Sequence, residues 1–250
     1  MSTSVSAYDG RGFGPIAYNE GYFDIAAGNY ANELASHWSS ASTDPYLYGS
    51  EFCDASLNGA CHDTGTLDLE TGDSSFLHTH GGGVGVFLMT YDTSNPGGTG
   101  YNTAPTYWEL GDTDLEFFET GACQSANYGA AGSVRSLSNG LHQWHGQHGD
   151  GGVIFGGAHI ADYIDDAFDG NISGAWITNF TSFGYWQSTD EDVCGMSVIL
   201  GTSTADCNTR RANEEYTNPG LYGDPPSVET AIYHYYCNCD PSGASATPNC

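Results

Sequence analysis

The chain is 250 residues long, has four arginines and no lysine against 31 acidic residues, and carries a formal net charge of −27 at pH 7. A field of this sign repels nucleic-acid phosphates and anionic membrane surfaces, so neither is expected as a partner. No apolar run approaches the ~18 residues that would span a membrane. The acidic surface instead favours solubility and attracts cations or basic peptides.

The length fits one large domain, and no linker argues for a second. We expect a single domain over residues 1–250, with its core at about 20–205 and a disulfide-rich C-terminal extension at about 206–250. The eight cysteines include the local pairs Cys53/Cys61 and Cys194/Cys207, which are typical of disulfide staples in exported proteins and lack the CxxC spacing of a zinc ribbon. These staples predict a secreted, extracellular protein. No signal peptide is visible at the start, so an exported chain would be present here in its mature form, with an added Met.

The first half of the chain is predicted to alternate short strands with one helix and two long loops. In order, the expected elements are a strand near Ser6–Tyr8, an amphipathic helix over Tyr22–Trp38, a loop over 44–73, a short strand from Ser75 that ends at His80, a strand over Val84–Tyr91 and a loop over 94–105. The second loop is long enough to act as a lid or binding loop.

The second half is predicted to contain four strands and two helices. In order, these are a buried strand over Leu115–Gly121, a strand over Gly140–Gly146, helices over Ile160–Phe168 and Ser173–Phe183, a core strand over Met196–Gly201 and a strand over Ala231–Cys237. Strands that alternate with helices in this way imply an α/β layered fold.

Two of these strands carry a histidine and a cysteine at their ends. The buried strand stops at Gly121, and the small-residue turn after it presents Cys123, whereas the upstream strand ends at His80 before a run of glycines. Ligands bind at the carboxyl edge of open α/β sheets, and neighbouring strands would place the imidazole beside the thiol. An adjacent histidine raises the thiolate fraction of a cysteine, and Gly81 and the Cys123 N–H could bind an oxyanion.

These residues resemble those of a known class of peptidases. His80-Gly81 followed by Gly121-Ala122-Cys123-Gln124-Ser125 resembles the His-Gly and Ala-Cys blocks of the caspase–gingipain–legumain class. Gly140-Leu141-His142 and Gly174-Ala175-Trp176 are similar to segments of an uncharacterised group of secreted, caspase-like bacterial proteins. The resemblance covers roughly residues 70–200. The stretch before His80 is less hydrophobic than the corresponding block of the class.

The resemblance implies a caspase-like α/β fold, with a largely parallel sheet flanked by helices and loops stapled by disulfides. It also implies that His80 is the general acid and base, that Cys123 is the nucleophile and that Gly81 lines the oxyanion site. The protein would then be a secreted cysteine endopeptidase that acts on a protein or peptide and requires no cofactor. The oligomeric state is left open.

Charge bears on the specificity of such an enzyme. A pocket for an acidic residue needs a buried arginine, and Arg210 and Arg211 stand in a predicted loop that looks like a cleavage site. A cleft walled by acidic residues favours a basic residue before the scissile bond, because charge-assisted hydrogen bonds contribute about 1.5–3 kcal/mol. We therefore expect cleavage after Arg or Lys, including self-cleavage at Arg210 or Arg211.

Other functions compete with this one. His78, His145, His148 and Asp150 offer metal ligands together with His80, although no acidic third ligand follows the His78/His80 pair, so we expect no catalytic zinc. A non-enzymatic extracellular binding or surface-assembly protein on a degenerate caspase-like fold is a further alternative, in which Cys123 would be half of a disulfide. Acidic stretches at 112–114 and 162–169 could hold structural calcium.

Overall fold

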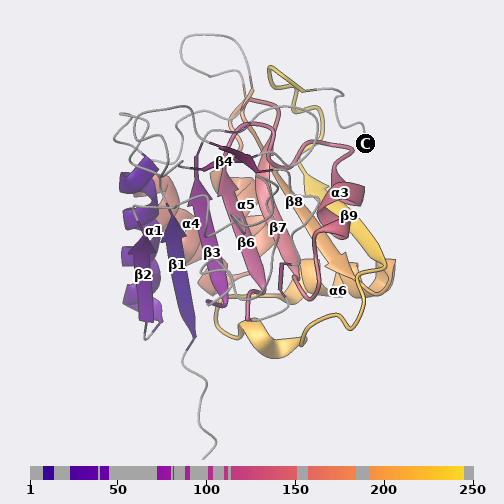
Figure 1. Cartoon of the computed structure of the whole chain (residues 1–250), viewed down its shortest axis with the longest axis horizontal. Helices are drawn as coiled ribbons and strands as arrows, with labels where there is room; N and C mark the ends of the chain where they lie inside the picture. Colours follow the sequence, from indigo (N-terminus) through magenta and orange to yellow (C-terminus); the bar gives the residue numbers. More distant parts are fainter. Residues whose placement is uncertain are drawn as a thin grey trace, which may run out of the picture.

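The computed structural model describes residues 8–13, 23–38, 40–44, 72–79, 81, 88–90, 101–103, 110–111, 114–150, 157–183 and 192–244. These residues form a seven-stranded sheet in the order β2-β1-β3-β6-β7-β8-β9, drawn from left to right in Figure 1, and a separate β4-β5 pair. The strands of the large sheet are β1 (Asp9–Phe13), β2 (Ser40–Asp44), β3 (Ser74–His78), β6 (Phe117–Gly121), β7 (Gln143–His148), β8 (Cys194–Gly201) and β9 (Thr230–Tyr235).

The sheet is mostly parallel. Strands β2, β1, β3, β6 and β7 pair in parallel, whereas β8 is antiparallel to β7, and β9 is antiparallel to β8. The small pair is β4 (Leu88–Thr90) with β5 (Tyr101–Thr103). The predicted α/β class, with a largely parallel sheet flanked by helices, is confirmed.

Hydrophobic side chains fill a layer on each face of the sheet. On one face, α1 (Phe23–His37), α4 (Gly157–Asp169) and α5 (Ile172–Asn179) pack over Phe76 and Phe117. The next residues along these strands, Leu77 and Phe118, point to the other face, because side chains alternate along a strand. There they pack in the layer that includes α3 (Ala131–Ser136).

Helix α1 lies close to β1 because β1 has glycine where the helix approaches. A Cβ on Gly12 would lie 2.3 Å from the carbonyl oxygen of Ala27, and one on Gly10 would lie equally close to the Leu34 side chain. Helix α1 matches the helix predicted over Tyr22–Trp38. The strand predicted near Ser6–Tyr8 lies mostly outside the described residues, and β1 begins directly after it.

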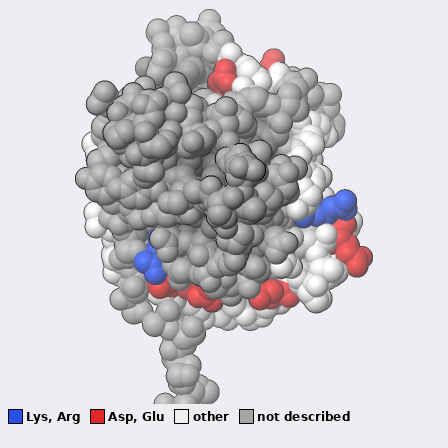
Figure 2. All heavy atoms as spheres, in the orientation of Figure 1, with Lys and Arg blue, Asp and Glu red and all other residues white. Residues whose placement is uncertain are grey.

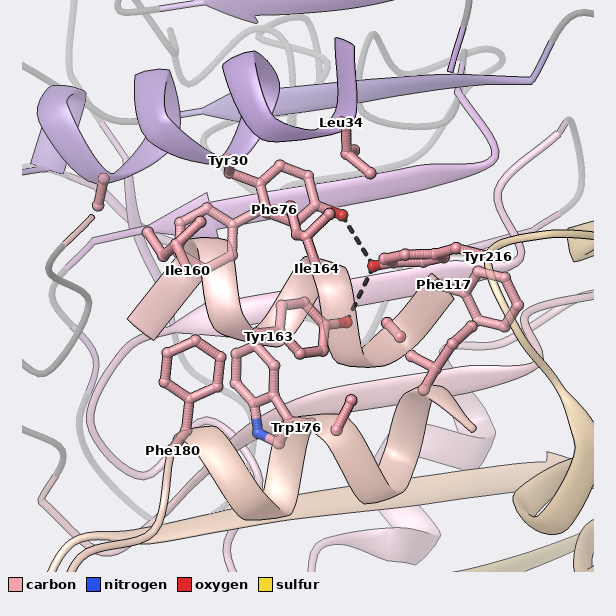
Figure 3. Close-up of a cluster of buried hydrophobic side chains, with 14 of the residues drawn as sticks. Tyr30, Leu34, Phe76, Phe117, Ile160, Tyr163, Ile164, Trp176, Phe180 and Tyr216 are labelled. Carbon is pink, nitrogen blue, oxygen red and sulfur yellow. Dashed lines mark hydrogen bonds between the residues drawn. The ribbon is translucent and has the colours of Figure 1, made fainter. Parts of the chain in front are cut away.

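The layer beneath α1, α4 and α5 also holds three buried tyrosines whose hydroxyls point toward one another (Figure 3). The hydroxyl of Tyr216 lies 3.0 Å from that of Tyr30 and 2.9 Å from that of Tyr163. Buried hydroxyls require hydrogen-bond partners, and these three find them in one another and in the fully buried carboxylate of Glu119.

The C-terminal part of the chain adds to the same sheet. Strand β9 pairs along all of its six residues with β8, and the disulfide Cys194–Cys239 joins the start of β8 to the segment after β9. The expected local pair Cys194/Cys207 is wrong: Cys207 is a buried thiol whose Sγ donates to the Thr230 carbonyl oxygen at 3.6 Å. Cys53 and Cys61 lie outside the described residues.

The loop predicted around Arg210 and Arg211 is instead a helix, α6 (Thr204–Asn213). The Ser203 side chain caps it by accepting from the Asp206 N–H, and Arg210 is buried in ion pairs with Asp206 and Glu214 at 3.1 and 3.0 Å. Proteases cut extended, exposed segments, so cleavage at this site would require α6 to unfold. The prediction that Arg210 and Arg211 lie in a loop is wrong, and self-cleavage there stays a prediction.

The remaining elements agree with the sequence in part. The strands expected at Met196–Gly201 and Ala231–Cys237 are β8 and β9, and the two predicted helices at 160–183 are α4 and α5. Part of the strand expected over Val84–Tyr91 is β4, and the loop expected over 94–105 contains β5. Within the described ranges, no helix has the length and apolar character needed to cross a bilayer.

Candidate active site

The carboxyl ends of β3 and β6 lie side by side. The two strands pair in parallel over five positions, from Ser74↔Phe117 to His78↔Gly121, and the Thr79 N–H donates to the Gly121 carbonyl oxygen at 3.4 Å. Both strands are fully buried, as predicted for the second strand, whereas β3 ends at His78, two residues before the predicted end at His80. The predicted end of the second strand at Gly121 is confirmed, and the turn that carries Cys123 begins directly after it.

The Cys123 turn has an unusual backbone. Cys123 carries a reduced, half-buried thiol, and the next residue, Gln124, has a φ of 59°. This left-handed conformation is uncommon for a residue other than glycine, and it occurs often at active sites where surrounding contacts hold it. The Gln124 N–H donates to the Gly149 carbonyl oxygen at 2.6 Å, which supplies one such contact.

Hydrogen bonds fix this turn against the end of β7. The Ser125 hydroxyl donates to the Ala122 carbonyl oxygen at 2.7 Å and accepts from the Gln147 N–H at 3.1 Å. The Ala126 N–H donates to the Gln147 carbonyl oxygen at 3.0 Å. The turn is thus anchored on both sides of Cys123 by buried groups, which holds the thiol at a defined position on the sheet edge.

Close approach of the turn to β7 depends on Gly146. A Cβ at this position would lie 2.5 Å from Ser125 Oγ, 2.7 Å from Thr120 Oγ1 and 2.9 Å from Ala126 Cβ. Sequence reasoning did not single out Gly146 or Gln124. The available signal was a glycine inside a strand pattern, because such a glycine marks a close backbone approach.

A carboxylate lies beside the Cys123 turn at the end of β7. Gln124 Nε2 donates to Asp150 Oδ1 at 3.0 Å, and the Asp150 N–H donates to the Ser242 carbonyl oxygen at 2.6 Å. Asp150 is half-buried. An acidic group therefore stands one strand away from the turn that carries the thiol.

The histidine half of the predicted dyad falls outside the described residues. His80 is the second residue after β3, just as Cys123 is the second after β6, and Gly81 is described as half-buried. The roles predicted for His80, Cys123 and Gly81 remain predictions.

The structure distributes the metal candidates over separate places. His145 is fully buried, with Nδ1 2.7 Å from Ser197 Oγ, and burial lowers its pKa to about 3. His148 is also buried, but its Nδ1 accepts from the Tyr128 N–H at 3.1 Å. His78 is buried at the end of β3. In the described ranges, the clusters with metal-binding spacing are Asp9/Asp73/Asp114 and Asp192/Cys194/Cys239, and the latter contains the disulfide.

Comparison with known proteins adds no identification. No protein-family model matches the sequence, and neither a curated protein nor a solved structure matches it significantly. The resemblance to cysteine peptidases therefore depends on the residues around His80 and Cys123 themselves.

Proposed function

We propose that the protein is a cysteine peptidase in which Cys123 is the nucleophile and His80 the general acid and base. The observation that carries the proposal is the parallel pairing of β3 with β6 up to His78↔Gly121. His80 and Cys123 each stand two residues beyond that last pair, so the chain leaves adjacent strands in equivalent register just before each residue. In the caspase–gingipain–legumain class, the catalytic histidine and cysteine follow adjacent parallel strands in the same way.

The chemistry would proceed through an acyl-enzyme. The Cys123 thiolate attacks the scissile carbonyl carbon, the C–N bond breaks, and His80 donates a proton to the leaving amine. Water, deprotonated by His80, then hydrolyses the thioester and restores the thiol. The tetrahedral oxyanion needs N–H donors, for which the backbone of Cys123 and of Gly81 are the candidates. The anchored turn supports this role, because such donors must be held in place before the reaction.

The charge near the thiol supports a basic residue before the scissile bond. Asp150 lies next to the Cys123 turn, and the side chain that donates a hydrogen bond to its carboxylate, that of Gln124, is neutral. With four arginines in 250 residues, the protein has few positive charges to line a pocket for an acidic residue. Cleavage after Arg or Lys would place a cation beside this carboxylate.

Site-specific labelling and turnover test the proposal. An electrophilic peptide with arginine at its reactive end should label wild-type protein and fail to label Cys123→Ala. Turnover of fluorogenic peptides that end in Arg should fall by on the order of 10⁴-fold or more in Cys123→Ala, because the nucleophile is gone. His80→Ala should lower turnover by roughly 10²–10⁴-fold, the usual contribution of a general acid–base group.

Cys207 provides the matched control. It is a buried thiol at the opposite edge, near the end of β8, and burial raises its pKa to about 11, so it should react slowly. Cys207→Ala should keep both labelling and turnover. Equal labelling of wild type and Cys123→Ala, or no turnover of any peptide by folded wild type, would contradict the proposal and favour a binding protein. Faster turnover of Asp-ended peptides would contradict only the basic preference.

A further inference from the structure

Three neighbouring strands of the sheet begin with carboxylates at the edge opposite Cys123. Asp9 is the first residue of β1, Asp73 precedes β3, and Glu116 precedes β6. Because Gly10 pairs with Ser74, and Ser74 with Phe117, the three acidic residues occupy one row across the strands. Figure 2 shows acidic side chains along this lower edge, where β1 and β3 start in Figure 1.

A fourth acidic residue completes the group. Carboxylate oxygens of Asp9, Asp73 and Asp114 all lie within 4.8 Å of one another. The Asp9 N–H also donates to Asp73 Oδ2 at 2.7 Å, which fixes the relative position of the first two residues. Calcium binds oxygen at about 2.3–2.6 Å, so two ligands of one ion can lie up to roughly 5 Å apart. The three carboxylates therefore have a spacing that a single calcium ion could bridge.

Glu116 gives an independent indication of a missing partner. The residue is only 9% exposed, and Oε2 has no hydrogen-bond partner among the residues that the structure describes. The Glu116 N–H donates to the Asp73 carbonyl oxygen at 3.0 Å, which places the residue against the same group. After burial itself, the charges that act on Glu116 most strongly are those of Asp73 and Asp114. A buried, unpaired carboxylate oxygen is costly, and a cation would remove that cost.

The positive charge described nearby is small. The guanidinium of Arg11 approaches Asp9 Oδ2 to 3.8 Å, while His142 lies against Asp224 at 3.6 Å. Asp224 adds a further negative charge that acts on both Asp114 and Glu116. Arg11 thus supplies one positive charge beside four acidic residues, so acidic side chains are in excess in this group.

We propose that Asp9, Asp73 and Asp114, whose oxygens already have the required spacing, bind one calcium ion at the amino ends of β1, β3 and β6, and that the neighbouring Glu116 carboxylate turns toward this ion as a further ligand. All four supply hard oxygen ligands, and the set contains no nitrogen or sulfur donor, which suits calcium better than zinc or copper. The ion would link the starts of three strands, two of which lead to His80 and Cys123. The site does not depend on the peptidase proposal.

Calorimetric titration with calcium chloride at low ionic strength tests this site, together with thermal unfolding in calcium and in EDTA. We expect one ion per chain. At calcium concentrations about 100-fold above Kd, the unfolding midpoint should rise by roughly 5–10 °C over that in EDTA. No binding heat together with identical midpoints in calcium and EDTA would overturn the proposal.

Two substitutions localise the site. Asp114→Asn, at an exposed position, should weaken calcium binding by roughly 10–100-fold or more, the loss typical of mutating even outer-shell partners of a metal. Glu229→Gln removes the same charge from an exposed position just before β9, outside both acidic stretches considered for calcium, and should bind like wild type. Equal affinity in Asp114→Asn and wild type would overturn the assignment.

Glu116→Gln should change stability in opposite directions under the two conditions. Without calcium, the unfolding midpoint should rise above that of wild type, because glutamine replaces an acidic group whose ionisation is opposed by burial and by the neighbouring Asp73 and Asp114. With calcium, the added stabilisation should be smaller than in wild type, because a ligand is lost. A variant with a lower midpoint in EDTA and an unchanged calcium response would show a purely structural carboxylate and contradict its role as a ligand.

Discussion

Glu119 is a fully buried carboxylate in the centre of the sheet, held by hydroxyl groups from four different segments. Tyr216 and Tyr163 donate to Oε1 at 2.5 and 3.0 Å, and Ser74 and Tyr30 approach Oε2 at 2.9 and 3.3 Å. Burial raises its pKa to about 7, although these hydrogen bonds favour the charged form and act in the opposite direction. The side chain therefore titrates near neutral pH inside the core.

This titration should appear in the stability of the protein. The pKa of Glu119 is higher in the folded than in the unfolded chain, so its contribution to stability is complete below the unfolded pKa and is lost as pH rises through about 7. A shift from 4.5 to about 7 corresponds to about 3 kcal/mol. We expect the unfolding free energy of wild type, relative to Glu119→Gln, to fall by about this amount between pH 4.5 and 8.

Denaturant unfolding of both proteins at each pH measures this difference. Asp73 and Glu116 also have raised pKa values, but their contributions are common to both proteins and cancel in the comparison. A constant difference between wild type and Glu119→Gln across this pH range would show that the carboxylate does not titrate there.

The sequence does not predict the burial of Glu119, whereas it does predict that Cys123 lies in a turn directly after a strand. The hydroxyls around Glu119 belong to residues 44 to 97 positions away in the chain, so no local pattern brings them together. The Cys123 turn is different, because a buried apolar run followed by Gly121 and Ala122 determines where the strand ends. Local periodicity predicts where a strand ends, but only the tertiary fold determines which side chains surround a given residue.

Secondary structure elements with a local apolar pattern were predicted, whereas those that depend on distant contacts were missed. Apolar patterns predicted α1, α4, α5, β6 and β8 because each buries a face or a whole strand. Strand β2, with the sequence Ser-Ala-Ser-Thr-Asp, was missed because it is an edge strand whose pairing with β1 depends on a distant partner. Helix α6 has little apolar content, and ion pairs of Arg210 stabilise it. Its Ser203 cap, three residues before Asp206, was the usable signal.

Docking of the Cys123 turn against β7 can be tested with a single methyl group. Gly146→Ala would force the new Cβ against Ser125, Thr120 and Ala126, and overpacking of this kind costs about 1–3 kcal/mol. The clash lies beneath the turn, so labelling of Cys123 by the electrophilic peptide should slow as well. Gly28→Ala is the matched control: a Cβ there meets nothing within 4 Å, and alanine inside α1 should stabilise by about 0.5–1 kcal/mol.

Denaturant midpoints and labelling rates of these two variants distinguish a specific effect on the Cys123 turn from general destabilisation by added volume. Destabilisation by Gly146→Ala with an unchanged labelling rate would show that the turn does not depend on its contact with β7. Destabilisation by both variants to the same extent would show a general intolerance of added volume.

At the scale of the whole molecule, charge is the dominant property. A net charge of −27 with four arginines leaves few opportunities for opposite charges to pair, and two of the arginines form ion pairs in the described structure. The folded state brings these like charges closer together than the unfolded chain does, so their repulsion lowers the stability of the compact form. Hydrophobic burial in the two core layers acts against this repulsion.

Added salt should therefore stabilise the protein. The Debye length falls from about 10 Å at 0.1 M to about 3 Å at 1 M, which screens the repulsion between surface carboxylates. We expect the thermal midpoint in EDTA to rise steadily with sodium chloride from 0.05 to 1 M, because few surface ion pairs exist for salt to weaken. At pH 4, where many carboxyl groups are protonated, the same increase in salt should have a smaller effect. A midpoint that falls with salt at pH 7 would show that attractive ion pairs, rather than self-repulsion, control the stability of this acidic fold.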